Sequence, residues 1–239
     1  MTENRWHDIW QGKGSELPEG DNPGLTDLIR ADGFDSGAGD HTIESWTGFA
    51  QSVYRRLGLG NDDRVLEVGC GSGAFLYLAR DLCKELAGVD YSGSLVALAQ
   101  RAMPEGRFRQ AEAAELPFAE AEFDLVLSHS VFQYFPSDDY ARRSIEEMLR
   151  VLEPEAGRLA ILDVNDIDRE EVFYRERQAQ LGDEDYETRY DGLPHRFYSK
   201  QWFHEILEPL GFTVETVDQA IAGYGNSAFR FNVFATRTP

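Results

Sequence analysis

A glycine-rich turn after a short apolar strand is the first feature of this sequence that could do chemistry. The strand Val65-Leu-Glu-Val68 runs directly into Gly69-Cys-Gly-Ser-Gly73, and a helix is predicted to begin right after the last glycine. Glycines let the backbone turn sharply and approach a ligand, while the free N–H groups at a helix start face the same point. The arrangement predicts a binding site for a small nucleotide-like molecule.

Two acidic residues flank this turn and restrict the ligand. Asp90 ends the next predicted strand, and a carboxylate at that place can accept two hydrogen bonds from a ribose diol. Glu67 lies just before the first glycine, where its charge disfavours a pyrophosphate and favours a cationic amino-acid group. However, Gly69, Gly71 and Ala74 also satisfy the dinucleotide fingerprint, so an NAD-dependent oxidoreductase stays an alternative.

The elements that must position these residues alternate between apolar strands and helices, which is typical of parallel βαβ units. The predicted strands span residues 64–68, 86–89, 107–111, 123–127, 157–162, 212–217 and 229–236. The predicted helices span residues 42–57, 74–83, 92–102, 137–152, 169–180 and 199–210, and residues 25–31 are expected to form only one short turn or two. Residues 220–227 are too few for a helix crossover, so the last two strands should pair antiparallel.

Four segments together resemble class I S-adenosylmethionine-dependent methyltransferases. Val65-Leu-Glu-Val-Gly-Cys-Gly-Ser-Gly73 resembles the first motif of that family, and Val89-Asp-Tyr-Ser92 resembles the second. Glu112-Ala-Ala-Glu-Leu-Pro-Phe118 is similar to the adenine-side segment, and Phe123-Asp-Leu-Val-Leu-Ser-His129 to the fourth strand. The resemblance covers about residues 53–236. It implies a Rossmann-like, doubly wound α/β fold with a seven-stranded sheet of order 3-2-1-4-5-7-6 and an antiparallel strand 7.

The resemblance also implies which residues hold the cofactor, S-adenosyl-L-methionine. Glu67 and the turn glycines would line the methionine moiety, Asp90 would bind the ribose hydroxyls, and Tyr91 would cover one adenine face. Ser128 would lie beside the sulfonium, while Ala111-Glu112 replaces the usual Gly-Asp pair of the family. The full set is Glu67, Gly69, Gly71, Gly73, Asp90, Tyr91, Glu112, Ala113 and Ser128.

The catalytic base is expected in the segment after the fourth strand. Some small-molecule members of the family have a histidine where Gln133 stands, and an amide cannot take up a proton. His129 is the nearest replacement, and its neutral form should be active with an apparent pKa near the ordinary ~6.5. The alternatives are an acceptor that is already deprotonated, and catalysis by alignment alone. Further candidates for contact with the acceptor are Gln133, Tyr134, His195, Tyr198, Tyr224 and Asn226.

The first 41 residues differ in composition from the rest of the chain. They are rich in Gly and Trp, and residues 12–24 hold too many helix breakers for a long helix. We therefore expect an N-terminal arm or lid over residues 1–41, with Trp6 and Trp10 folding over the cofactor, and a methyltransferase domain over residues 42–239. Such a lid would exclude water and align the reacting groups.

Composition restricts the partners. The 239 residues include 23 Lys and Arg against 43 Asp and Glu, a formal net charge of −20. Nucleic acid and anionic membranes are poor partners for such a chain. No apolar run reaches membrane-spanning length, and the first residues lack the n-region and h-region of a signal peptide, so we do not expect export. The two cysteines, Cys70 and Cys83, make no disulfide framework, and the five histidines show no metal-ligand spacing. We expect a cytoplasmic protein without a metal.

The sequence thus predicts an S-adenosylmethionine-dependent methyltransferase that moves a methyl group to an O or N atom of a small-molecule acceptor. Two alternatives from other classes remain: the NAD-dependent oxidoreductase, and a module that binds a nucleoside cofactor without turnover. The acceptor itself, the choice between O and N, and the oligomeric state are left open.

Overall fold

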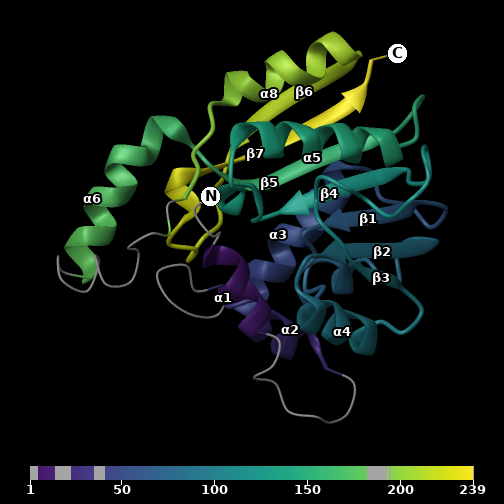
Figure 1. Ribbon diagram of the computed structural model, residues 1–239, viewed down its shortest axis with the longest axis horizontal. Coiled ribbons are helices and arrows are strands. Elements are labelled where there is room, and N and C mark those ends of the chain that lie inside the picture. The colour runs from purple at the N-terminus through teal and green to yellow at the C-terminus, as the bar shows by residue number, and fades with distance from the viewer. Residues whose placement is uncertain (1–4, 14–22, 35–40, 182–192, 194, 239) are drawn as a thin grey trace.

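A seven-stranded sheet forms the centre of the computed structural model (Figure 1), in the order β3-β2-β1-β4-β5-β7-β6. The structure describes residues 5–13, 23–34, 41–181, 193 and 195–238. The strands are β1 (Arg64–Val68), β2 (Glu85–Asp90), β3 (Arg107–Gln110), β4 (Leu125–His129), β5 (Arg158–Asn165), β6 (Phe212–Asp218) and β7 (Arg230–Arg237). Strands β1 to β5 pair parallel, whereas β7 is antiparallel to both β5 and β6. The predicted fold class and the antiparallel final pair are confirmed.

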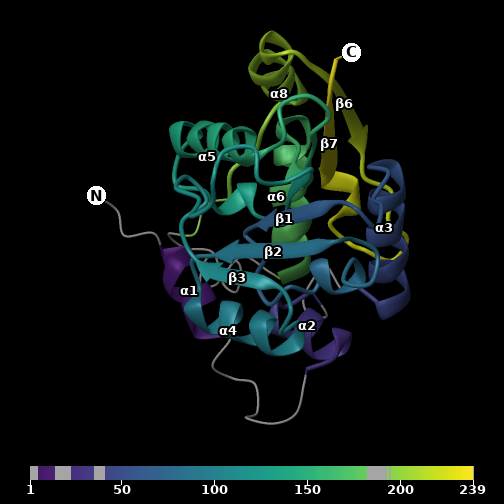
Figure 2. The same cartoon turned by 90° about the vertical axis from the view of Figure 1, so that its right-hand side faces the viewer.

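Helices cover both faces of this sheet (Figures 1 and 2). They are α1 (Arg5–Lys13), α2 (Leu25–Ala31), α3 (Ile43–Arg56), α4 (Gly93–Ala102), α5 (Asp138–Val151), α6 (Glu170–Leu181) and α8 (Lys200–Leu207). Alternate residues of a strand point to opposite faces, so Val65 packs in one cluster with α2, α3 and α4. The next residue, Leu66, packs in a second cluster with α5 and α8. Both layers bury the central strands, which fixes the strand ends where ligands of such sheets bind.

The side chains at the helix starts explain where three of these helices begin. Thr42 accepts a hydrogen bond from the backbone N–H of Ser45 at 3.0 Å at the start of α3. Ser92 and Ser137 play the same role at the starts of α4 and α5. Hydroxyl oxygens satisfy N–H groups that have no partner within the helix. These helices therefore begin where the sequence predicts.

The predicted helix over residues 74–83 is wrong. The structure describes this whole segment, and it holds a single 3-10 turn, Leu76–Leu78, followed by further turns up to β2. Backbone carbonyls at the start of the segment accept hydrogen bonds from the Trp46 ring N–H at 3.3 Å and from the Tyr54 hydroxyl at 2.9 Å. These α3 side chains satisfy carbonyls that a helix would pair with its own N–H groups. Tertiary contacts thus replace the helix.

The N-terminal part joins the same core. Leu28 and Ile29 of α2 belong to the buried cluster that α3 and α4 form on the sheet. In the described ranges, no helix is long and apolar enough to cross a membrane. The division of the chain at residue 41, and the opening of residues 1–41 as a lid, stay predictions.

Replacing Tyr54 with Phe should lower the free energy of unfolding by about 1 kcal/mol, because the Phe75 carbonyl loses a buried hydrogen bond. Denaturant titration measures this loss, with Tyr77→Phe on the partly buried side of the same segment as the control. An equal loss in the two variants would show that the Tyr54 hydroxyl does not hold this segment.

Candidate active site

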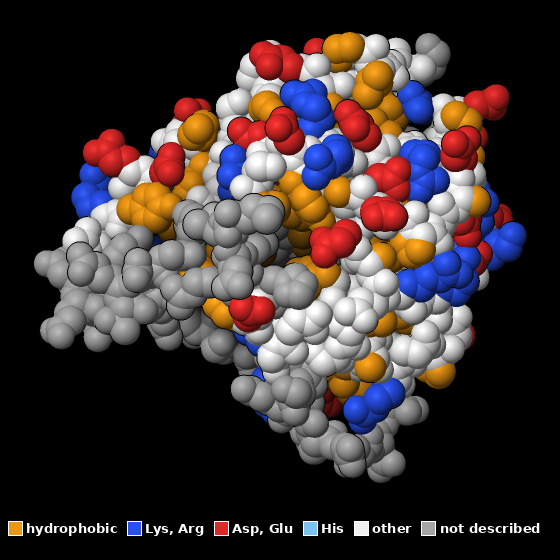
Figure 3. All heavy atoms as spheres, in the orientation of Figure 1, with side chains coloured by type: hydrophobic (Ala, Val, Ile, Leu, Met, Phe, Trp, Pro, Cys, Tyr) orange, Lys and Arg blue, Asp and Glu red, His pale blue; other side chains and the backbone are white. Residues whose placement is uncertain are grey.

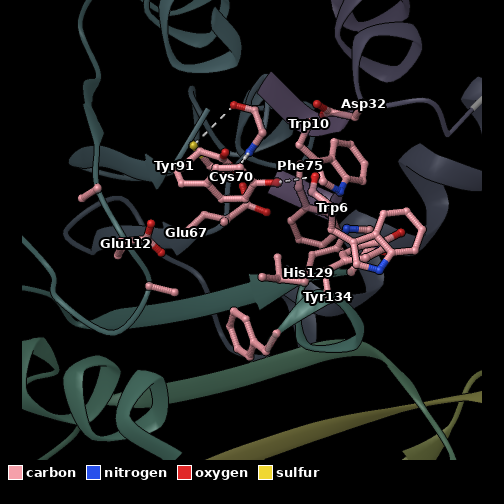
Figure 4. Close-up of a pocket in the computed structure, with 18 of the residues that line it drawn as sticks. Trp6, Trp10, Asp32, Glu67, Cys70, Phe75, Tyr91, Glu112, His129 and Tyr134 are labelled. Atoms are coloured by element: carbon pink, nitrogen blue, oxygen red, sulfur yellow. Dashed lines mark hydrogen bonds between the residues drawn. The ribbon is translucent and has the colours of Figure 1, made fainter. Parts of the chain in front are cut away.

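A cavity of about 580 Å3 opens at the carboxyl ends of β1, β2 and β4. Because β1 lies between β2 and β4, this is the point where the strand order reverses, the usual ligand site of an open α/β sheet. Aromatic side chains gather on one side of it, and Glu112 lies on the other (Figure 4). On the face shown in Figure 3, hydrophobic side chains edge a hollow, and acidic and basic side chains are mixed over the surface above it.

The glycine turn after β1 has no room for larger residues. Gly69 and Gly71 have φ angles of +75° and +52°, which L side chains rarely adopt. A Cβ atom on Gly71 would lie 2.5 Å from Oδ1 of Asp32, and one on Gly69 would strike Val131. Gly73 packs against Met103 instead and does not line the cavity. The first two glycines form the cavity wall, and the third supports it.

Asp90 ties this turn to the start of α4. Its Oδ2 accepts a hydrogen bond from Gly71 N at 2.9 Å, and its Oδ1 accepts one from Ser92 N at 2.8 Å. Burial raises the pKa of Asp90 to about 6, although these two backbone bonds favour the charged form. A carboxylate can accept about four hydrogen bonds, so Asp90 keeps acceptor capacity on the cavity side.

Glu67 is a buried acid, and one of its carboxylate oxygens has no hydrogen-bond partner among the described residues. Its side chain is 2% exposed, and the oxygen without a partner is Oε2. Burial, and then the charges of Asp32 and Asp90, raise the pKa of Glu67 well above its usual range. The hydroxyl of Ser128 is likewise buried without a partner in the described structure, but Ser128 is not among the residues that line the cavity. Orphaned buried polar atoms of this kind indicate groups that a ligand satisfies.

The opposite wall carries the residues expected beside an adenine. Tyr91, Glu112 and Ala113 all line the cavity. The hydroxyl of Tyr140 donates to Glu112 at 2.5 Å, and the Tyr91 hydroxyl donates to the Trp6 carbonyl at 3.1 Å. These hydrogen bonds hold Glu112 and Tyr91 in place at the cavity.

Helix α1 closes the cavity from the N-terminal side, and the sequence did not predict it as a helix. Trp6 and Trp10 line the cavity, and the Trp6 ring contacts Tyr134 and His195 at centroid distances of 4.8 and 4.9 Å. The carbonyl of Trp10 accepts a hydrogen bond from the Ser92 hydroxyl at 3.1 Å. These contacts place both tryptophans at the cavity, as the sequence suggests.

His129 lies at the end of β4 and lines the cavity. Its ring stacks on Phe75 with centroids 4.9 Å apart, and the edge of Trp46 meets it at 5.2 Å. Burial lowers the pKa of His129 to about 4, against the opposing charge of Asp163. The imidazole is therefore neutral at pH 6 and above, rather than titrating near 6.5.

Of the remaining candidates for acceptor contact, two lie at the cavity and the others are buried away from it. Tyr134 lines the cavity, and His195 contacts Trp6 next to it. Burial, with the charges of two arginines, lowers the pKa of His195 to about 3. Gln133 is fully buried and donates to Ser130 Oγ at 2.8 Å. Tyr198 is also buried, away from the cavity lining, and donates to the Phe132 carbonyl.

Tyr224 and Asn226 lie in a buried polar cluster outside the cavity lining. Tyr224 stacks on His41 at 4.0 Å and donates to Asp163 Oδ2 at 3.1 Å, while Asn226 pairs with Arg177. Burial would raise the pKa of Asp163, but the charges of Arg230 and His129, with side-chain hydrogen bonds, lower it.

Asp163 was not identified from the sequence. It follows the predicted fifth strand directly, and it has a left-handed φ of +59°, like Ser130 with +57°. Non-glycine residues in this region are strained, and such strain concentrates at functional sites. Its position at a strand end was the signal that could have identified it.

Asp32 is the second residue that sequence reasoning missed. It follows α2, is 7% exposed and lines the cavity. Its Oδ1 accepts from Ser72 N and its Oδ2 from Ser72 Oγ, both at 2.8 Å. No local pattern marks it, because it reaches the glycine turn only when the N-terminal segment folds back.

Comparisons with known proteins point to one family. Residues 66–161 match the sequence model of a family described as a methyltransferase domain. The malonyl-[acyl-carrier protein] O-methyltransferase of Enterobacter lignolyticus is 32% identical over 105 residues, 44% of this chain and 41% of that relative. Methyltransferase GfsG of Streptomyces halstedii is 33% identical over 132 residues, 52% of this chain and 46% of that relative. Over residues 66–161 the chain is therefore similar to this methyltransferase family.

A solved structure of a methyltransferase shares the fold of this chain. Magnesium protoporphyrin IX methyltransferase (ChlM) from Synechocystis PCC 6803, with bound S-adenosylhomocysteine, has a TM-score of 0.64 and 17% identity. The match covers 100% of both chains, and at this identity it concerns the fold alone. This chain spans less than half the length of the two curated relatives.

The described residues fit the cofactor of this family, S-adenosylmethionine. Glu67 and Asp90 present carboxylate oxygens at the glycine turn, and one Glu67 oxygen is unpaired among the described residues. The described lining includes five carboxylates, from Asp8, Asp32, Glu67, Asp90 and Glu112, and neither Lys nor Arg. A pyrophosphate would be repelled by this lining, whereas a sulfonium and an ammonium group would be attracted.

Replacing Asp90 with Asn should weaken S-adenosylhomocysteine binding by about 1 to 3 kcal/mol, because an amide has a single acceptor oxygen for two backbone N–H groups and a ribose diol. Titration calorimetry measures the change. Asp81→Asn, whose carboxylate is exposed, is the matched control. Equal affinity in the two folded variants would remove Asp90 from the site.

Proposed function

We propose that this chain transfers the methyl group of S-adenosylmethionine to an O or N atom of a small-molecule acceptor. The observation that carries the proposal is the cavity at the β1 turn, with its carboxylates, its aromatic side chains and the unpaired buried oxygen of Glu67. Bound S-adenosylmethionine supplies a methyl group already activated on a sulfonium. The protein has to hold this methyl group in line with the acceptor, exclude water and accept one proton.

Each predicted cofactor residue would contact a different part of S-adenosylmethionine. Glu67 with Gly69 and Gly71 would hold the methionine moiety, and Asp90 would bind the ribose hydroxyls. Tyr91, Glu112 and Ala113 would surround the adenine, and Ser128 would lie beside the sulfonium. Gly73 supports the turn from behind.

The aromatic wall favours an acceptor that is neutral or cationic and partly apolar. Trp6, Trp10, Phe34, Trp46 and Tyr134 line this side of the cavity. An anionic acceptor would have to enter beside carboxylates without a Lys or Arg in the described lining. The net charge of −20 argues against nucleic acid in the same way.

His129 is the proposed proton acceptor. It lines the cavity, and its lowered pKa leaves the ring neutral, so one ring nitrogen is free to take a proton at neutral pH. The N-terminal residues 1–41 would act as the lid, since Trp6 and Trp10 already cover the cavity from that side. Tyr134 and His195 adjoin these tryptophans and are the nearest further candidates for acceptor contact.

Calorimetry with S-adenosylhomocysteine and with NADH tests the cofactor. We expect binding of the first and none of the second, because the acidic lining repels a pyrophosphate. Consumption of S-adenosylmethionine in the presence of amine, phenol and carboxylate acceptors then tests turnover. Tight NADH binding would support the oxidoreductase, and cofactor binding without turnover of any acceptor would support a binding module.

Replacing His129 with Ala should lower turnover about 100-fold or more with little change in cofactor affinity. Because burial lowers the pKa of His129 to about 4, the wild-type rate at saturating S-adenosylmethionine should be flat between pH 6 and 8 and fall below about pH 5 as the ring gains a proton. His204→Ala, on the partly exposed surface of α8, is the control. Near-normal turnover of the His129 variant would assign the ring a packing role.

A further inference from the structure

Asp32 brings a third buried carboxylate to the glycine turn from a distant part of the chain. Both of its oxygens are fixed by Ser72, and its backbone carbonyl accepts from Lys13 Nζ at 3.5 Å. A Cβ atom on Gly71 would lie 2.5 Å from Oδ1 of Asp32, so the carboxylate packs closely against the turn that forms the cavity wall. Asp32 is therefore part of the cavity and not a surface acid.

The electrostatic surroundings of Asp32 are predominantly negative. Glu67 of β1 and Asp90 of β2 face it, and Lys13 of α1 is the cation that acts on it. Burial raises the pKa of Asp32 to about 7, with the Ser72 hydrogen bonds opposing and the charge of Asp90 adding to the shift. The Cys70 thiol beside these acids also has a raised pKa and stays neutral. A cationic ligand would relieve repulsion among the three carboxylates.

We propose that Asp32 is a cofactor-selecting residue, whose carboxylate favours the sulfonium of S-adenosylmethionine over the uncharged sulfur of S-adenosylhomocysteine. The inference rests on the proposed function, because it assumes that these two molecules occupy the cavity. The two ligands share the adenosine, the ammonium and the carboxylate, and differ at sulfur by one methyl group and one positive charge. A residue that responds to this charge helps S-adenosylmethionine to displace S-adenosylhomocysteine, the product that remains after methyl transfer.

The same arrangement couples cofactor binding to proton release. A cation favours the ionised form of Asp32, so its pKa falls in the complex and a proton leaves. Affinity for S-adenosylmethionine should therefore rise with pH through about 7, and the affinity for S-adenosylhomocysteine should rise less. Asp90, with a pKa raised to about 6, adds a second response at lower pH.

Asp32→Asn tests the proposal because it removes the charge and keeps the shape. The amide oxygen can still accept from Ser72 N, and the amide nitrogen can donate to Ser72 Oγ. At pH 7.5 we expect the dissociation constant for S-adenosylmethionine to rise about 10-fold and that for S-adenosylhomocysteine about 3-fold or less. The ligand-free variant should melt about 3 °C higher at this pH, because a buried charge is gone. Glu44→Gln, an exposed acid on the neighbouring α3, is the control.

The ratio of the two dissociation constants, measured in the variant and in the wild-type protein, tests whether Asp32 selects the cofactor. If Asp32→Asn keeps the wild-type ratio of the two dissociation constants, Asp32 only holds the turn and the inference is overturned, while the proposed function stands. If the variant does not fold, the wild-type ratio measured from pH 5.5 to 7.5 takes its place, and a constant ratio overturns the inference. If the wild-type protein binds neither ligand, the proposed function fails and the inference fails with it.

Discussion

Burying Asp32, Glu67 and Asp90 around one glycine turn costs free energy, and much of the local structure serves to offset it. Backbone N–H groups of Gly71 and Ser92 hold Asp90, and Ser72 holds Asp32. Burial nevertheless raises the pKa values of all three acids, and neighbouring acidic charges add to each shift. The ligand-free site is thus held in an unfavourable electrostatic state, which a cation of suitable shape can relieve.

A second group of buried polar side chains surrounds Asp163. Asp163 and Arg230 are both almost fully buried, and hydrogen bonds from Gln219 and Tyr224 complete the surroundings of this carboxylate. Here the acid is stabilised in its charged form, unlike the acids at the glycine turn. His129 lies between the two regions, with its ring against Phe75 and within electrostatic reach of Asp163. Its environment is apolar enough to keep it neutral.

The family resemblance implied the sheet order, whereas the cavity-lining residues near strand ends could be predicted because their signals are local. Asp90 and Tyr91 follow an apolar strand, and His129 ends another, so alternating patterns place them. The predicted helix over residues 74–83 fails because Trp46 and Tyr54, distant in the chain, satisfy carbonyls that local rules give to a helix. Asp32 was missed for the same reason: its role depends on a contact 40 residues away in the chain.

The attachment of α1 has an evolutionary consequence. Hydroxyls of Ser92 and Ser94 donate to the carbonyls of Trp10 and Gln11, which are among the last four of α1 and have no partner within the helix. The Tyr91 hydroxyl likewise binds a backbone oxygen, that of Trp6. Because these bonds use the main chain, side chains on the cavity side of α1 can be exchanged while the helix stays docked. Descendants of this protein could therefore acquire new acceptors by substitutions in α1 alone, with the nucleoside-facing wall left intact.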